Sequence, residues 1–208
     1  MSFFLSSLGR KYLMALTGLV LAVFLVFHAA GNSLICKDKA AVAVYAEHLH
    51  SLGLLFIAAE AFLLAVFLLH ISVGLSLALT NRNTKGRNYA VSSSAVGLRG
   101  WPSRNMPCTG VTVLAFLVLH LATVRFAGQT LPLTDRIRQA LTNPLFAAGY
   151  AVGLAALGLH ISHGFWSLTQ SLGLSYPRWN LLIRGLACLA AVFSISIFAA
   201  VILLYQLQ

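Results

Sequence analysis

The chain has 208 residues, of which 59% are hydrophobic and only 9% are charged. Soluble domains carry about 25% charged residues, so this composition excludes an ordinary soluble enzyme and predicts an integral membrane protein. The formal net charge is +10, but the basic residues lie in connectors between apolar runs. That distribution is typical of membrane topology and of docking a soluble partner, rather than of nucleic-acid binding.

Five apolar runs are long enough to cross a lipid bilayer as helices. They are predicted at about 11–35, 52–80, 106–127, 144–172 and 181–206, with the basic segment 81–105 as the longest connector between two of them. Asn143-Pro144 predicts the start of the fourth helix. Only helices satisfy every backbone group in lipid without a partner. The expected fold is an all-α membrane protein, a five-transmembrane-helix bundle in which residues 1–208 form one domain.

The first run follows Arg10-Lys11, as a signal peptide would, but it is long and contains His28, which predicts a retained helix. Nine of the 14 Lys and Arg residues fall on the N-terminal side of the membrane and five on the other. The positive-inside rule therefore predicts a cytoplasmic N-terminus and a C-terminus outside. The expected location is the bacterial cytoplasmic (inner) membrane, crossed several times.

Four histidines inside the apolar runs belong to two repeated motifs. Phe-Leu-Val-x-His ends at His28 and again at His120, 92 residues later, and His-Ile-Ser-x-Gly begins at His70 and again at His160, 90 residues later. Ionisable groups at membrane depth are costly and are read as functional by default. The chain therefore looks like a two-helix unit that is used twice and then extended by a fifth helix.

Depth along the helices sorts these histidines into two layers. At 1.5 Å per residue, His28 and His120 lie near the outer face, and His70 and His160 lie about 15 Å from the inner side. Two neutral imidazoles at one depth on different helices can bind haem iron from both faces, which favours electron transfer over oxygen chemistry. We therefore expect haem, with the four histidines as metal ligands in two pairs.

Nearby residues fit this reading, although each has a simpler alternative. Gly74 and Gly164 follow His70 and His160 by four residues, so they share a helical face with them and could leave room for a flat ring, as could Gly31 and Gly158. Ser72 and Ser162 could bond their own helix carbonyls. The alternatives are interhelical hydrogen bonding for a single histidine and helix packing for the glycines. His163 is the rival of His160, but the repeat aligns it with Val73.

Several segments resemble one known family. Ser103-Arg104-Asn105-Met106 with Gly110 and the Phe116–His120 motif is similar to the third helix of the succinate dehydrogenase cytochrome b558 family. Further resemblance lies at Gly9-Arg10-Lys11 to Thr17-Gly18, at Tyr45-Ala46-Glu47 with Leu49 to Gly53, and at His160-x-Ser162-x-Gly164-Phe165-Trp166 with Leu172-Gly173. The resemblance extends over nearly the whole chain.

The resemblance implies the diheme membrane anchor of a succinate:quinone or quinol:fumarate oxidoreductase, with two b haems. It implies a menaquinone substrate, and a flavoprotein and an iron–sulfur subunit as partners that carry FAD and the iron–sulfur clusters. By motif, His70 and His160 would hold the haem nearer the iron–sulfur subunit, and His28 and His120 the outer haem. Some members have a glutamate two residues before the fourth-helix ligand. This chain has Gly158 there and departs from that pattern.

This chain alone would not act on a dicarboxylate. Cys36, Cys108 and Cys188 form no C-x-x-C motif, so neither iron–sulfur ligation nor covalent haem attachment is expected. The direction of catalysis, the haem potentials, the quinone tail, the proton route and a dimer of the complex are left open. The alternatives are the cytochrome b subunit of a membrane hydrogenase or formate dehydrogenase, and a haem-free transporter.

Two sets of polar residues are candidates for cofactor and substrate contacts. At the inner face, we expect at least one of Arg10, Lys11, Trp101 and Arg104 to contact the propionates of the inner haem. At the outer face, quinone chemistry needs a titratable group near water. Glu47 is the predicted residue there, followed by His48, His50 and the deeper Glu60, and its simplest alternative is a solvated charge in a connector.

Overall fold

The computed structural model describes residues 6–84, 101–127, 131–174 and 177–207, without the side chains at 39, 81–84, 101–104, 177, 180 and 184. Helices account for the secondary structure of these ranges, and no strand is present in them. The elements in chain order are α1 (Ser7–Ser33), the 3₁₀ turn η2 (Leu34–Cys36), α2 (Lys39–Ser51), α3 (Leu54–Thr84), α4 (Trp101–His120), the π-helix η3 (Leu121–Arg125), α5 (Leu133–Thr142), α6 (Pro144–Ser171) and α7 (Pro177–Gln206).

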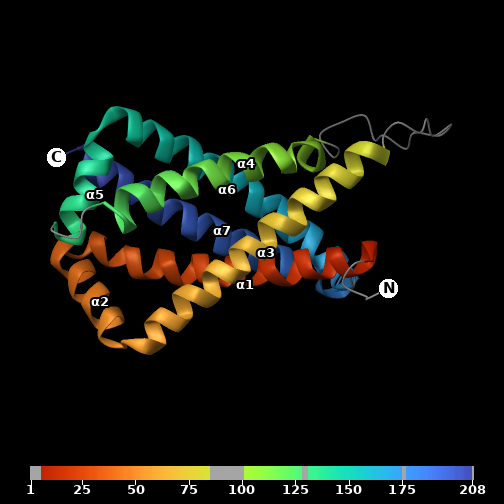
Figure 1. The fold of residues 1–208 in the computed structure, drawn as a ribbon, viewed down its shortest axis with the longest axis horizontal. Coiled ribbons are helices and arrows are strands. Elements are labelled where there is room, and N and C mark those ends of the chain that lie inside the picture. Colours follow the sequence, from red (N-terminus) through yellow and green to blue (C-terminus); the bar gives the residue numbers. More distant parts are fainter. Residues whose placement is uncertain (1–5, 85–100, 128–130, 175–176, 208) are drawn as a thin grey trace.

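Five of these helices are long and apolar enough to cross a membrane, which confirms the expected spans. Helix α3 is inclined to the others, and the N- and C-termini lie at opposite ends of the bundle (Figure 1). The predicted start of the fourth span is also confirmed. The Asn143 side chain accepts hydrogen bonds from the Leu145 and Phe146 amides, and Pro144 occupies the first turn, where no amide hydrogen is needed.

The helix boundaries differ from those predicted from hydropathy, because polar residues that flank an apolar run can also be helical. The third and fifth helices begin at Trp101 and Pro177, a few residues before their apolar runs. Two connectors also contain helices, α2 and α5. Helix α2 begins at Asp38, whose carboxylate accepts from the Ala40 amide. Hydropathy locates spans and not short connector helices, so these two were missed.

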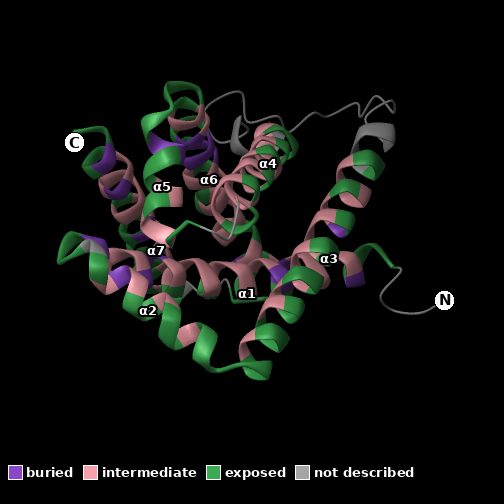
Figure 2. Ribbon diagram, turned by 60° about the vertical axis from the view of Figure 1, so that its left-hand side comes forward, coloured by how far each residue is buried: buried purple, intermediate pink, exposed green. Residues whose placement is uncertain are grey.

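The packing of the helices is uneven. Helix α1 contacts α3, α6 and α7, and α6 contacts α4 and α7, whereas α3 and α4 have little contact with each other. Buried side chains gather at the end of the bundle near α2 and α5 (Figure 2), in the cluster of Ile35, Val42, Leu141, Tyr150, Val201 and Tyr205. Gln206 donates a side-chain hydrogen bond to the Leu141 carbonyl there, which ties the end of α7 to α5.

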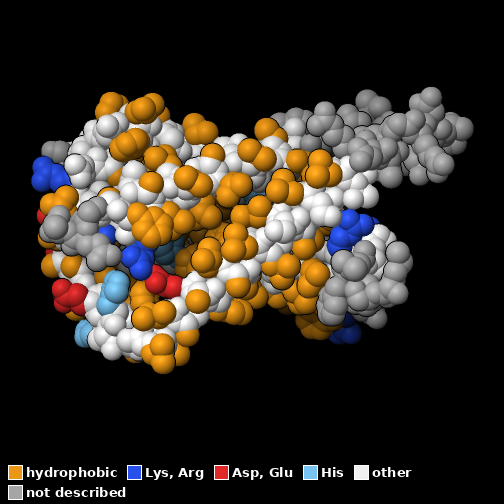
Figure 3. Space-filling model, viewed as in Figure 1, with side chains coloured by type: hydrophobic (Ala, Val, Ile, Leu, Met, Phe, Trp, Pro, Cys, Tyr) orange, Lys and Arg blue, Asp and Glu red, His pale blue; other side chains and the backbone are white. Residues whose placement is uncertain are grey.

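The outer surfaces of the spans are apolar. Leu and Phe side chains of α3 and α7 are more than half exposed, including Leu64, Phe62 and Leu189. Figure 3 shows hydrophobic side chains along the length of the helices and charged ones mostly at the two ends. Exposed apolar bands of this length fit a lipid bilayer. Between α3 and α4 this face is hollowed, and histidine atoms are visible in its depth (Figure 3).

Candidate functional site: two histidine pairs

The four span histidines meet in two pairs, each between one helix of α1–α3 and one of α4–α6. The outer pair is His28 of α1 and His120 at the end of α4, whose ring centroids are 6.0 Å apart with an 82° interplanar angle. The inner pair is His70 of α3 and His160 of α6, at 6.4 Å and 75°. It lies nearer the end where α1 begins. These are the pairs that depth along the helices predicts.

The spacing within each pair suits a shared metal ion. Two metal–nitrogen bonds of about 2 Å in line, with about 1.2 Å from each nitrogen to its ring centre, separate two imidazole centroids by about 6 Å. The rings can rotate about that common axis, so steep interplanar angles are compatible with it. The same spacing also lies within the range of edge-to-face contact between two free rings.

The inner histidines each hydrogen-bond a threonine of the neighbouring helix. His70 Nδ1 lies 3.0 Å from Thr17 Oγ1 of α1, and His160 Nδ1 lies 3.3 Å from Thr109 Oγ1 of α4. The ring's Nε2 is then the nitrogen left for another partner. Each imidazole bound to a metal ordinarily uses its second nitrogen in this way, which fixes the orientation of the ring.

The outer histidines differ from each other. His120 Nδ1 is 3.4 Å from the Tyr150 hydroxyl, which is 2.7 Å from Thr123 Oγ1. His28 has aromatic neighbours instead, stacking on Phe24 at 5.4 Å and meeting Phe198 at 5.5 Å. Among the described residues no hydrogen bond to either ring nitrogen of His28 is present, so only His120 is held by a polar side chain.

The two layers are a fixed distance apart along the helices. Eleven residues separate Thr17 from His28 and also Thr109 from His120. Eleven residues are about three turns and about 16 Å of rise, so each threonine and the following histidine share a helical face. Helices α1 and α4 therefore each present one outer histidine and one partner of an inner histidine.

Glycines next to the rings are not the ones that the sequence pattern singled out. A Cβ at Gly18 would lie 3.4 Å from His70 Cε1, and a Cβ at Gly110 would lie 3.4 Å from His160 Cε1. Gly74 and Gly164 instead face the methyl groups of Met14 and Met106, Gly31 faces the Tyr45 ring, and Gly158 faces Ile195. These four glycines have neighbouring side chains beside them, and space for a flat ring at these positions stays a prediction.

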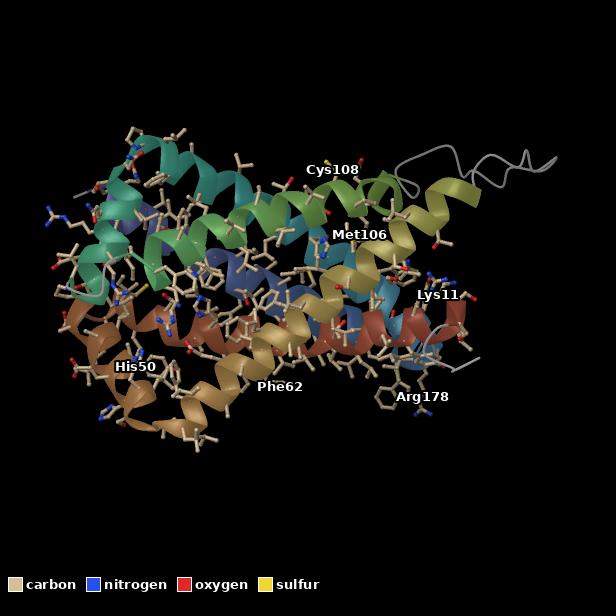
Figure 4. All side chains as sticks on the ribbon, viewed as in Figure 1. Lys11, His50, Phe62, Met106, Cys108 and Arg178 are labelled. Atoms are coloured by element: carbon tan, nitrogen blue, oxygen red, sulfur yellow. The ribbon has the colours of Figure 1, made fainter. Side chains whose placement is uncertain are left out.

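Basic residues lie at the end where α1 begins, where Figure 4 shows Lys11 and Arg178. Arg10 Nη1 donates to Ser76 Oγ at 2.9 Å and to Thr80 Oγ1 at 3.3 Å, and its buried Nε has no acceptor among the described residues. Lys11 is exposed. The side chains of Trp101 and Arg104 lie outside the described residues.

The carboxylates at the opposite end have different surroundings. Glu47 is exposed on α2, as is His48, and His50 Nδ1 lies 2.7 Å from the Ala46 carbonyl one turn earlier. Glu60 lies within the α3 span and forms a two-point ion pair with Arg125, both contacts being 3.2 Å. The cost that the sequence assigns to Glu60 at membrane depth is thus reduced by a paired charge.

Sequence reasoning did not identify Thr17, Thr109 and Tyr150. A signal was present for the threonines, because Met14-x-x-Thr17-Gly18 recurs as Met106-x-x-Thr109-Gly110 with the same 92-residue offset as His28 and His120. The predicted bonds from Ser72 to Leu68 and from Ser162 to its own helix are present, but both serines are exposed. Comparison with protein-family models, with curated proteins and with solved structures finds no match to this chain.

Proposed function

We propose that this protein is the diheme cytochrome b membrane anchor of a succinate:quinone or quinol:fumarate oxidoreductase. The observation that supports it most directly is the presence of two half-buried histidine pairs, at 6.0 and 6.4 Å, in two layers of a five-span bundle. The resemblance of the helix motifs to the succinate dehydrogenase cytochrome b558 family gives the proposal its reaction class.

The residues of the two layers fit haem b. His70 and His160 would hold one haem and His28 and His120 the other, and bound haem would supply one-electron transfer. Three of the four imidazoles already have a hydroxyl at Nδ1, which leaves Nε2 for the iron. The orphaned Arg10 Nε at the inner end suits a haem propionate, with Lys11, Trp101 and Arg104 as further candidates.

The dicarboxylate chemistry belongs to partners in this proposal. The three cysteines are exposed and unpaired on separate elements, so FAD and iron–sulfur clusters would reside in a flavoprotein and an iron–sulfur subunit. Those subunits would dock at the basic cytoplasmic face, in a bacterial inner membrane with the N-terminus inside. Electrons would pass between the iron–sulfur subunit and menaquinone through the inner and then the outer layer.

Glu47 is the proposed proton-exchanging residue of the quinone site. It is exposed at the end of the bundle beyond the outer pair, where water can supply or accept protons. In the purified complex, Glu47→Gln should lower quinone-linked turnover steeply and leave both haems and dye-linked succinate oxidation intact. Unchanged quinone turnover would make Glu47 a surface residue, with His48, His50 and then Glu60 as the next candidates.

A reduced-minus-oxidised spectrum of the purified protein tests the central claim. We expect b-type bands with two haems per chain, and co-purification of flavin- and iron–sulfur-containing subunits in equal amounts. His163→Ala is the matched control for His160→Ala, because both residues lie on α6 and only His160 meets His70. A protein without b-type bands would leave the haem-free transporter, and b haems without those partners would favour another cytochrome b complex.

A further inference from the structure

We propose that the Thr-Gly pairs Thr17-Gly18 in α1 and Thr109-Gly110 in α4 are matched positioning sites that set the tautomer and the rotation of His70 and His160. This inference rests on the proposed function, in which those histidines bind the inner haem. Neither threonine is a ligand. Each acts through the imidazole that it touches.

The direction of each hydrogen bond follows from the threonine's other partner. Thr17 Oγ1 lies 2.7 Å from the Leu13 carbonyl, and Thr109 Oγ1 lies 3.1 Å from the Met106 carbonyl. A carbonyl can only accept, so the hydroxyl hydrogen is committed to it. With the hydroxyl hydrogen on the carbonyl, the threonine oxygen accepts from the imidazole, and this arrangement has the hydrogen of both His70 and His160 on Nδ1.

This tautomer is the one that a metal ligand needs. With Nδ1 protonated and donating, the lone pair is on Nε2. Thr17 is also buried, with 6% of its surface exposed, so water does not compete for its oxygen. The ring is thus prepared for binding through Nε2 before any partner arrives, which lowers the ordering cost of binding.

The glycine beside each threonine sets the position of the ring. The 3.4 Å approach of a Cβ at Gly18 or Gly110 to the imidazole Cε1 is ordinary contact, so alanine fits. A longer side chain would extend toward the ring and displace it. One turn away, Met14 packs on Gly74 and Met106 on Gly164, which fixes the register between each pair of helices. The same set of contacts occurs twice, in segments 92 residues apart. A repeated set of contacts of this kind is not a chance approach of two side chains.

The hydroxyl should also tune the inner haem. Donation from Nδ1–H makes an imidazole a stronger electron donor to a bound metal. A stronger donor favours the oxidised iron, so the bond lowers the reduction potential. Replacing threonine by valine keeps the shape and removes the acceptor, which should raise the midpoint potential of the inner haem and leave the outer one unchanged.

The test uses the complete purified complex with redox titration, electron paramagnetic resonance and haem content as readouts. The variants are Thr17→Val and Thr109→Val, the conservative Thr17→Ser and Thr109→Ser, and Thr112→Val as control. Thr112 is half-buried on α4, and among the described residues it bonds only its own helix, at the Cys108 carbonyl. The inner haem is identified as the one that His70→Ala removes.

We expect both valine variants to shift the midpoint potential of the inner haem upward and to change the paramagnetic resonance of that haem, or to lose the inner haem alone. The serine and Thr112→Val variants should keep wild-type values.

Gly18→Leu should lose the inner haem and Gly18→Ala should retain it, with Gly185→Leu as control, because nothing lies within 4 Å of a Cβ at Gly185. Unchanged inner signals in both valine variants, or equal losses in valine and serine variants, would overturn the inference while the haems of the wild type uphold the proposed function. A wild type without haem would overturn the proposed function itself.

Discussion

The two halves of the repeat agree in the inner layer and differ in the outer layer. In the inner layer α1–α3 and α4–α6 use the same residue types at the same positions, a Thr-Gly pair against a histidine and a methionine against a glycine. In the outer layer His120 has the Tyr150 hydroxyl, whereas His28 has aromatic rings. The inner site therefore has the same contacts in both halves, and the outer site has a polar side and an aromatic side.

Pseudo-equivalent positions show what has changed. The residue 90 positions before Tyr150 is Glu60, and the residue 92 positions before Thr123 is Gly31. Glu60 pairs with Arg125 of the other half, and Gly31 makes room for the Tyr45 ring of α2. In the second half these positions hold polar side chains next to the outer histidine. In the first half they hold one member of a half-exposed ion pair and a glycine that accommodates a connector helix. Ionisable groups in an otherwise apolar span indicate function on that side.

The largest expected effect comes from removing a histidine. On the proposed function, His70→Ala or His160→Ala should abolish the inner haem, and His28→Ala or His120→Ala the outer, because one imidazole cannot fill both axial positions. Haem-to-protein ratios of the purified variants measure this. Loss of the same haem from His28→Ala and His70→Ala, with the other intact, would contradict the assignment of layers that underlies the comparison.

The second prediction concerns the unequal packing of the halves. A Cβ at Gly153 of α6 would clash with the Phe116 ring of α4, whereas the position 90 residues earlier, on α3, is Leu63. Gly153→Ala should therefore lower the free energy of unfolding in detergent by about 1–3 kcal/mol through overpacking. Gly185→Ala is the control and should be neutral or slightly stabilising, since its Cβ meets open space. Equal free energies of unfolding for the two variants would contradict a packing difference between the halves.

The spans and the histidine pairing followed from the sequence because both depend on local quantities. Hydropathy sets the length of a span, and 1.5 Å per residue sets the depth of His28 or His70 along it. The neighbours of Gly74 and the partner of Glu60 could not be obtained in this way. They depend on the rotation and tilt of each helix, which are set by contacts with other helices, and every surface of an apolar helix looks alike in composition. The Thr17 and Thr109 contacts were accessible only through the repeat.

The third prediction tests the ion pair that crosses between the halves. Glu60 and Arg125 are 40% and 44% exposed, so solvent or headgroup screening limits their interaction. Their two-point geometry nevertheless places the coupling near the upper end of the range for exposed pairs, about 1 kcal/mol. The free energies of unfolding of the wild type, Glu60→Gln, Arg125→Met and the double variant form a double-mutant cycle that measures this coupling. A coupling of zero would show that the pair does not hold α3 against the second half.

The smallest expected effect is that of Tyr150→Phe, which makes the outer layer more alike in the two halves. With Thr123 donating to the Leu119 carbonyl at 2.8 Å, its oxygen is free to accept from Tyr150, and the Tyr150 oxygen is then free to accept from His120 Nδ1–H. Removing the phenolic oxygen should cost about 1 kcal/mol of stability. On the proposed function, it should also raise the midpoint potential of the outer haem alone, since His120 loses an acceptor. The rise should be smaller than that in Thr17→Val, because the bond to His120 is 3.4 Å long and that to His70 is 3.0 Å.

Redox titration of Tyr150→Phe measures this rise, with Tyr45→Phe as the control. Tyr45 is the first-half tyrosine that packs on Gly31. If both variants leave the outer potential unchanged, His120 is positioned without Tyr150, and the two outer histidines differ in surroundings but not in donor strength.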